Sequence, residues 1–140
     1  MKHLLITFVL LAGCGQGVND HRGASPSLLA VYEKIEAEVG IAFTCFATYA
    51  EQVSPTDNAG YKWGASKVIL IRDDVKMWDS FCKEELLLHE IAHCEFGLGE
   101  EADGIMNPQY RCDTEEIYKK DKAELIERIK KIIEAREKTD

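Results

Sequence analysis

Residues 86–97, with the sequence LLLHEIAHCEFG, decide the fold of this chain of 140 residues. Three leucines precede His89, and the stretch is apolar apart from its histidines and glutamates, so a helix over it is apolar on most faces. Such a helix lies buried at the centre of a domain. Because residues four apart on a helix project from the same face, His89 and His93 can direct both imidazoles at one metal ion.

Glu90 stands beside the first histidine, turned away from the ligand face but close enough to act through a water on the metal. Zinc lowers the pKa of such a water to about 7, and a carboxylate can then take its proton during attack on a carbonyl carbon. A bare HExxH pattern also arises by chance, as a surface charge cluster or as core histidines. Here a buried Glu–His cluster needs a compensating ion or partner, and the other histidines, His3 and His21, precede the expected domain. The pattern therefore predicts a zinc site with Glu90 as general base.

The first 25 residues indicate a compartment. Residues 1–13 carry a positive start and an apolar run too short to cross a bilayer, which is typical of a cleaved signal peptide. The sequence LAGC, which ends at Cys14, resembles the bacterial lipobox, whose cysteine is acylated; an ordinary secretory signal is the alternative. We expect residues 14–25 to be the lipidated cysteine and a flexible tether in the cell envelope. Gly15, where an aspartate would resemble an inner-membrane retention signal, favours the outer membrane.

Composition restricts the partners of the remaining domain, residues 26–140. The full chain has a formal net charge of −8, which makes nucleic acid a poor partner, because phosphate binding needs clustered lysine and arginine. The length suits one domain with a modest core, and we expect a monomer. An even number of cysteines in an oxidising envelope predicts two disulfides, with three possible connectivities. A zinc–thiolate site is the alternative, but no CxxC pair supports it. These cysteines are Cys45, Cys82, Cys94 and Cys112.

The pattern as a whole predicts a small α+β domain. A short mixed sheet is expected to pack on an N-terminal helix, the central HExxH helix and a long C-terminal helix. The helices should run from Ser25 or Ser27 to about Val39, from Asp79 or Ser80 to Phe96, and from Thr114 onward. The strands should cover Ile41 to Tyr49 and Ser66 to Ile71, with Tyr61 to Gly64 an edge strand or rim loop. The last helix should pack through Ile117, Leu125, Ile129 and Ile132.

Two segments, LHEIAHCEFGLGE at 88–100 and GIMNP at 104–108, resemble a metzincin-type zinc metalloprotease of the minimal, matrixin-like sort. The resemblance implies that Gly97 ends the active-site helix, that a third ligand follows within a few residues, and that Met106 forms a Met-turn under the metal. By itself Met106 would be interpreted as a core methionine. The chain departs from the family pattern in two places. Gly97 falls one residue late relative to HExxHxxGxxH, and no third histidine follows.

Several carboxylates compete for the place of the third ligand. The resemblance implies Glu100, which stands where the family has its third ligand, and Glu101 and Asp103 are neighbouring alternatives. All three can also be ordinary solvated acids. A gluzincin-like arrangement, in which the third ligand is a glutamate on a later helix, would use Glu115 or Glu116.

The positions of the cysteines suggest a pairing. Cys94 lies on the predicted ligand helix and Cys112 follows the Met-turn-like segment, so we expect a bond between them to tie that helix to the metal floor. Cys45 and Cys82 would then join the first strand to the start of the helix. Each bond is expected to contribute about 2–4 kcal/mol.

Two functions fit this sequence. The first is a zinc endopeptidase of the cell envelope, with a peptide or protein substrate laid along an edge strand near Tyr61 to Ser66. The second is a non-catalytic envelope lipoprotein, whose degenerate protease site binds zinc or a partner. Glu90 favours catalysis, because a structural zinc site has no use for a base, whereas the absence of a third histidine argues against it.

Overall fold

The computed structural model describes residues 25–51, 60–62, 67–109 and 112–139. The predicted signal peptide, the lipidation site Cys14 and the predicted tether up to residue 24 lie outside these ranges. Trp63 and Gly64 of the predicted edge strand and Ser66 at the start of the next predicted strand also lie outside them. None of the described helices is both long and apolar enough to cross a membrane.

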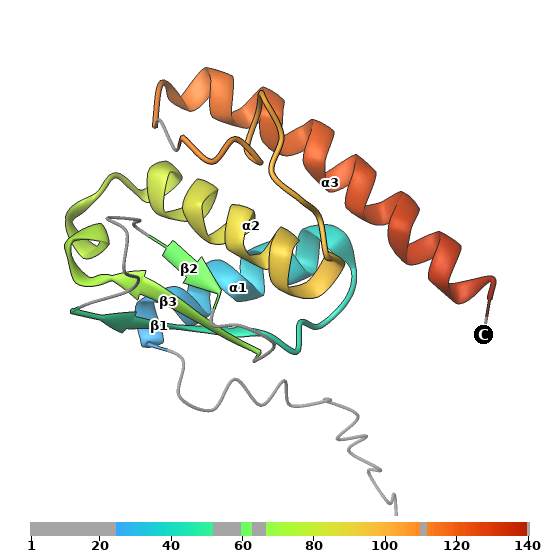
Figure 1. The fold of residues 1–140 in the computed structure, drawn as a ribbon, viewed down its shortest axis with the longest axis horizontal. Helices are drawn as coiled ribbons and strands as arrows, with labels where there is room; N and C mark the ends of the chain where they lie inside the picture. Colours follow the sequence, from blue (N-terminus) through green and yellow to red (C-terminus); the bar gives the residue numbers. More distant parts are fainter. Residues whose placement is uncertain (1–24, 52–59, 63–66, 110–111, 140) are drawn as a thin grey trace, which may run out of the picture.

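The described chain is an α+β domain built on a three-stranded mixed sheet (Figure 1). The central strand β3, Val68–Arg72, pairs in parallel with β1, Phe46–Ala50. It pairs in antiparallel fashion with β2, Gly60–Lys62, which forms the other edge. The helices α1 and α2 contact the sheet, and α3 lies along α2 (Figure 1). The predicted fold class and mixed sheet are thus confirmed.

Helix α1, Pro26–Val39, matches its prediction closely. Proline at the start suits a first turn whose N–H groups have no helical partner. Gly40 ends the helix with φ 83°, a left-handed conformation that glycine adopts without a steric penalty. The predicted face of Leu28, Tyr32, Ile35 and Val39 is buried in the core.

The first strand is shorter than predicted, because carboxylates bind the backbone ahead of it. The Glu36 side chain accepts a hydrogen bond from the Phe43 N–H at 2.7 Å. The Glu95 side chain accepts hydrogen bonds from the N–H groups of Thr44 and Cys45. These side-chain bonds satisfy backbone donors that would otherwise need a strand partner, so pairing begins only at Phe46.

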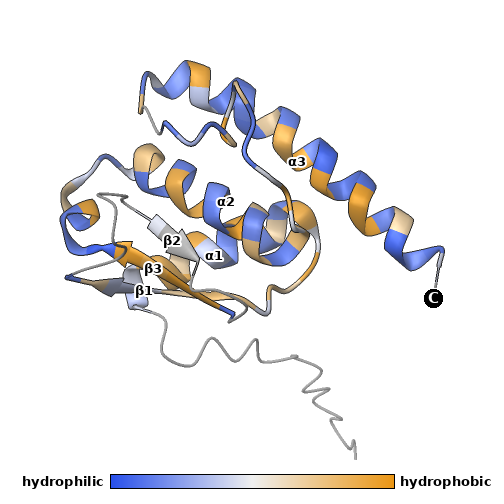
Figure 2. Ribbon diagram, viewed as in Figure 1, coloured by the Kyte–Doolittle hydropathy of each residue, from blue (hydrophilic) through white to orange (hydrophobic). Residues whose placement is uncertain are grey.

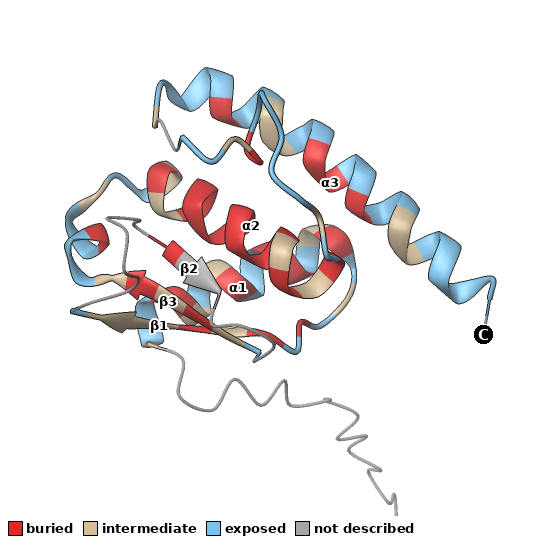
Figure 3. Cartoon of the chain, in the orientation of Figure 1, coloured by how far each residue is buried: buried red, intermediate tan, exposed pale blue. Residues whose placement is uncertain are grey.

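Helix α2, Ser80–Phe96, is the buried centre of the domain, as the sequence predicts. Most of its residues are buried, whereas the outward faces of the other helices are exposed (Figure 3). A short 3₁₀ helix, Asp73–Met77, leads into it from β3 and was not predicted. The helix ends at Gly97 with φ 64°, where the N–H groups of Gly97 and Leu98 bond back to carbonyls of the last turn.

Helix α3, Glu115–Glu137, begins where the Thr114 side chain accepts a hydrogen bond from the Ile117 N–H at 3.3 Å. Its hydrophobic residues form a stripe toward the rest of the domain, with charged residues outside (Figure 2). Leu125 and Ile129 are buried as predicted, but the first member of the predicted stripe is wrong. Ile117 is 47% exposed, and its neighbour Tyr118 packs inward against Phe81 instead.

The disulfides also correct a prediction. Cys45 bonds Cys94, and Cys82 bonds Cys112, so the expected Cys94–Cys112 and Cys45–Cys82 pairs are wrong. The reason is the direction of α3, which runs parallel to α2 (Figure 1). Its first turn lies beside Glu84, near the start of α2, and its last turn beside Glu95. The chain must therefore return along α2 before α3 begins, which carries Cys112 to Cys82.

Candidate metal centre

The two predicted ligand histidines lie side by side on α2. Their ring centroids are 4.6 Å apart, and the two Nε2 atoms are 3.0 Å apart. His89 is 7% exposed and His93 is partly buried. The four-residue helical spacing thus brings both imidazoles to one point, as expected.

The other nitrogen of each ring is held by the backbone. His89 Nδ1 lies 2.7 Å from the Ile105 carbonyl oxygen, and His93 Nδ1 lies 2.6 Å from the Leu98 carbonyl oxygen. A carbonyl oxygen can only accept, so each Nδ1 carries the proton. In the neutral ring, Nε2 is then an acceptor with its lone pair directed at the other histidine. Such a second contact fixes the tautomer of metal-binding histidines in general.

Glu100 completes the cluster. One carboxylate oxygen lies 3.2 Å from His93 Nε2, and the other lies 3.7 Å from His89 Nε2. One ligand atom from each of the three residues falls within 4.8 Å of the others. Two lone pairs and an anion cannot satisfy one another, so a proton or a metal ion has to lie between them, and the group has the geometry to hold a metal ion. Two imidazoles and a carboxylate are the donor set that suits zinc with a fourth position open.

The protonation of His89 agrees with a ligand role. Burial lowers its pKa, and a charge on His93 would lower it further, while the Ile105 carbonyl and Glu100 act in the opposite direction. A lowered pKa keeps the ring neutral near pH 7, and the neutral ring is the form that binds metal.

Glu90 lies outside the ligand group, in a different environment. The residue is only 5% exposed, and no described residue donates a hydrogen bond to its carboxylate. Burial, followed by the charge of Glu100, raises the pKa of Glu90 to about 7. A carboxyl group with this pKa can accept and return a proton near neutrality, which is the property that a general base needs.

The loop after α2 carries Glu100 and the two backbone carbonyl groups that contact the histidines. The Glu101 N–H donates to the Met106 carbonyl oxygen at 2.9 Å, which closes residues 101–106 into a loop directly after Glu100. The Asn107 side-chain amide donates to the Ala102 carbonyl oxygen at 2.6 Å. Met106 is 2% exposed and belongs to the hydrophobic core. Core packing of Met106 thus fixes the loop, and the fixed loop places the Ile105 carbonyl oxygen against His89.

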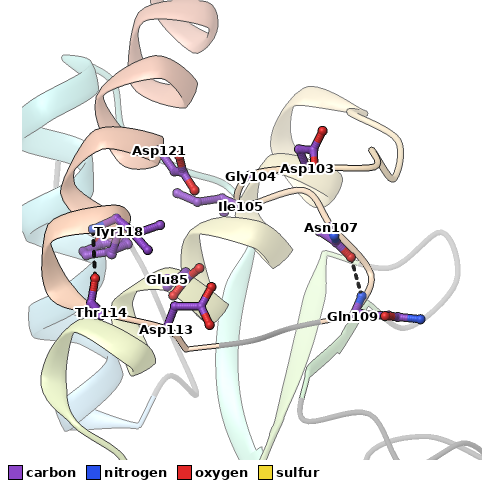
Figure 4. A pocket seen from close by; sticks show the side chains of 11 residues that line it. Glu85, Asp103, Gly104, Ile105, Asn107, Gln109, Asp113, Thr114, Tyr118 and Asp121 are labelled. Atoms are coloured by element: carbon purple, nitrogen blue, oxygen red, sulfur yellow. Dashed lines mark hydrogen bonds between the residues drawn. The ribbon is translucent and has the colours of Figure 1, made fainter.

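The rival ligands lie elsewhere. Glu101 pairs with Arg128 on α3, and Glu115 pairs with Lys119 at 3.0 Å. Asp103 borders a different cavity of about 320 Å³ between the loop and the start of α3 (Figure 4). Of the five candidate carboxylates, only Glu100 belongs to the group of described residues that can hold a metal. Glu101, Asp103, Glu115 and Glu116 are not part of that group.

Three contributors to the site were missed by the sequence analysis. The carbonyl groups of Leu98 and Ile105 belong to the backbone, and every residue has one, so no residue type marks them. Gly60 is the third, because a side chain there would collide with Glu90. The available signal was that Gly60 directly precedes the predicted edge strand, since a glycine at a strand often marks close approach of another group.

Comparisons with known proteins add no relative to this picture. No family model matches the chain, and no curated protein or solved structure matches it. The interpretation of the site therefore rests on its own residues: three converging acceptors and a buried carboxylate beside them.

Proposed function

We propose that this protein is a zinc-dependent endopeptidase anchored by lipid in the bacterial cell envelope. One observation carries the proposal: the ligand atoms of His89, His93 and Glu100 converge, with the buried carboxyl group of Glu90 adjacent in the chain. This combination supplies both metal binding and proton transfer, which peptide hydrolysis requires.

In this proposal, some residues bind the metal ion and another transfers the proton. His89 and His93 bind through Nε2, while the Ile105 and Leu98 carbonyls keep the rings oriented. Glu100 supplies a negative charge that offsets part of the charge of the ion. Zinc, when bound, supplies the Lewis acidity that makes water nucleophilic at neutral pH. With zinc bound, Glu90 would accept a proton from the attacking water and return it to the leaving amine.

The sheet offers a place for the substrate. Strand β2 is an edge of the described sheet and contacts α2, the helix that bears Glu90 (Figure 1). An extended peptide can add to such an edge through backbone hydrogen bonds. Tyr61 and Lys62, at the start of the segment predicted to bind substrate, lie in β2.

The alternative is a non-catalytic envelope lipoprotein that binds zinc for structure or binds a partner. Glu90 separates the two functions, because a purely structural site has no use for it. The Glu90 carboxyl group is buried without a hydrogen-bond donor from the described part of the chain, which costs stability, and a site that retains this cost is expected to use the group.

The decisive experiment compares wild type with Glu90→Gln, both as full-length chains purified in detergent. Zinc content is measured by mass spectrometry, and hydrolysis is measured with an internally quenched peptide library. We expect one zinc per chain in both proteins, and turnover lower by about 10²–10⁴ in the variant. Full activity in Glu90→Gln would exclude this mechanism. Zinc binding without hydrolysis in the wild type would favour the non-catalytic alternative.

A further inference from the structure

A glycine in the edge strand lies directly against the proposed base. Gly60 is the first residue of β2 and is buried. A Cβ atom at this position would lie 2.8 Å from Glu90 Oε1, 3.0 Å from Cγ and 3.2 Å from Cδ. A Cβ carbon and a carboxylate oxygen do not approach each other to 2.8 Å, so any residue larger than glycine at this position requires an atom to move.

Space, rather than backbone conformation, accounts for the glycine. The described glycines with positive φ are Gly40, Gly97 and Gly104, and Gly60 is not among them. An alanine would therefore be compatible with the backbone of β2. Its methyl group would still collide with the Glu90 side chain.

Neither partner can easily avoid that collision. The contact involves Glu90 Cγ and Cδ as well as the carboxylate oxygen, so a rotation of the end group alone does not relieve it. Glu90 is buried in the middle of α2, and Gly60 pairs with Ile71 of the central strand. Relief must come from a different Glu90 rotamer or from displacement of the edge strand.

We propose that Gly60 is a positioning residue of the catalytic site, whose missing side chain creates the space in which the Glu90 carboxyl group is held. The inference rests on the proposed function and extends it to the edge strand. The same contact fixes the spacing between the base and β2, so a peptide paired with this strand is also placed relative to Glu90. A 1 Å displacement of a catalytic group can cost about 100-fold in rate, which makes this spacing consequential.

The test is Gly60→Ala, measured alone and combined with Glu90→Ala. In the wild-type background, Gly60→Ala should lower the Tm by roughly 5–10 °C, as expected for overpacking of a core site. In the Glu90→Ala background the same change should lower it by less than about 2 °C, because the colliding atoms are gone. The double variant also serves if the single variant folds poorly.

The matched control is Gly99→Ala. Gly99 is exposed, has no positive φ, and a Cβ atom built on it meets no atom within 4 Å. Its effect on Tm should be the same with and without the Glu90 side chain.

Steady-state kinetics test whether the space at Gly60 matters for catalysis through Glu90. Gly60→Ala should retain zinc and leave KM within about threefold, while kcat falls by at least about tenfold. A loss of Tm that persists in the Glu90→Ala background, or a wild-type kcat in Gly60→Ala, would overturn the inference. A different outcome is also informative: the Tm effect of Gly60→Ala depends on the Glu90 side chain as expected, but the wild-type protein hydrolyses no peptide. That result would overturn the proposed function and leave the positioning of Glu90 by Gly60 standing.

Discussion

At the scale of single residues, the proposed metal centre is defined by the direction of the histidine lone pairs. Because Leu98 and Ile105 accept from the Nδ1 atoms, both Nε2 atoms point into the space beside Glu100. Without a cation, this arrangement sets two acceptors 3.0 Å apart. The stability of the loop and the affinity for metal should therefore depend on each other.

Glu100→Ala tests the third ligand. Losing one of three protein ligands should weaken zinc binding by at least about 100-fold. Glu101→Ala should weaken it by less than about fivefold, because its exposed ion pair with Arg128 contributes at most about 1 kcal/mol. Asp103→Ala serves as a second control with a similarly small effect. Competition with a chromophoric chelator measures all three, and unchanged affinity in Glu100→Ala would refute the assignment.

The residues of the site differ in how far sequence could identify them. His89, Glu90 and His93 were predictable because helical periodicity alone fixes their relative directions. Glu100 could be ranked first only through the family resemblance, since a loop has no such periodicity. The structure separates it from Glu101 and Asp103 by showing which carboxylate the turn at Gly97 directs toward the histidines.

At the scale of elements, a buried ionic cluster joins the three helices. Glu84 on α2 accepts hydrogen bonds from Lys34 on α1 and from Tyr118 and Lys122 on α3. Burial by itself would raise the pKa of Glu84, but the hydrogen bonds from Lys122, Lys34 and Tyr118 outweigh it and lower the pKa. A carboxyl group whose folded-state pKa is lowered contributes stability above its unfolded pKa, and this contribution is lost as pH falls through the folded value.

Lys122→Met should therefore destabilise the domain in a pH-dependent way. At pH 7 it leaves Glu84 charged and buried with fewer donors, and we expect a loss of about 2–4 kcal/mol. The loss should shrink toward pH 4, because Glu84 in the variant then takes up a proton. Urea unfolding at both pH values measures this. Lys119→Met is the control, since Lys119 is 70% exposed and its pair with Glu115 should contribute less than about 0.5 kcal/mol. Equal losses at both pH values would contradict the prediction.

The elements themselves were largely predictable where periodicity is strong. The amphipathic pattern and terminal glycine located α1, and the apolar run located α2. The start of β1 was not predictable, because it depends on Glu36 and Glu95 binding the backbone from other segments. Glu95 lies about 50 residues from the backbone that it binds, and Glu36 reaches the Phe43 N–H from the preceding helix, so neither contact follows from the alternation of residues within the strand.

The Cys82–Cys112 bond holds the end of the loop that carries Glu100 and both histidine acceptors. Replacing both cysteines by serine opens a loop of 30 residues and should cost about 3–4 kcal/mol. Zinc affinity should fall as well, because the Ile105 carbonyl oxygen is then less firmly held. Urea unfolding and chelator competition measure the two effects. A double variant with wild-type stability and affinity would show that the core contacts of Ile105 and Met106 alone fix the loop.

At the scale of the whole molecule, the parallel course of α2 and α3 determines the disulfide topology. The expected Cys94–Cys112 pair rested only on the position of Cys112 after the Met-turn-like segment. The contacts of Tyr118 with Glu84 and of Arg136 with Glu95 show instead that α3 starts beside the start of α2. The direction of a helix relative to its neighbour depends on packing along its full length, which residue spacing does not encode.

Lipid anchoring is the prediction that concerns the whole molecule in its cell. A net charge of −8 gives the chain no overall electrostatic attraction to an anionic lipid surface, so we expect the proposed membrane association to come from acyl chains. A single chain binds only marginally, whereas the several chains of a lipobox cysteine hold a protein stably. Cys14→Ser should therefore move the protein from the membrane fraction to soluble or unprocessed forms.

Cell fractionation with immunoblotting measures this shift, and Gly15→Asp provides the matched control one residue away. Gly15→Asp leaves the acylated cysteine intact, so the protein should remain in the membrane fraction. If the residue after the cysteine governs sorting, the variant should move from the outer to the inner membrane on a density gradient. A detergent-dependent membrane pool that is unchanged in Cys14→Ser would mean that acylation of this cysteine does not anchor the protein.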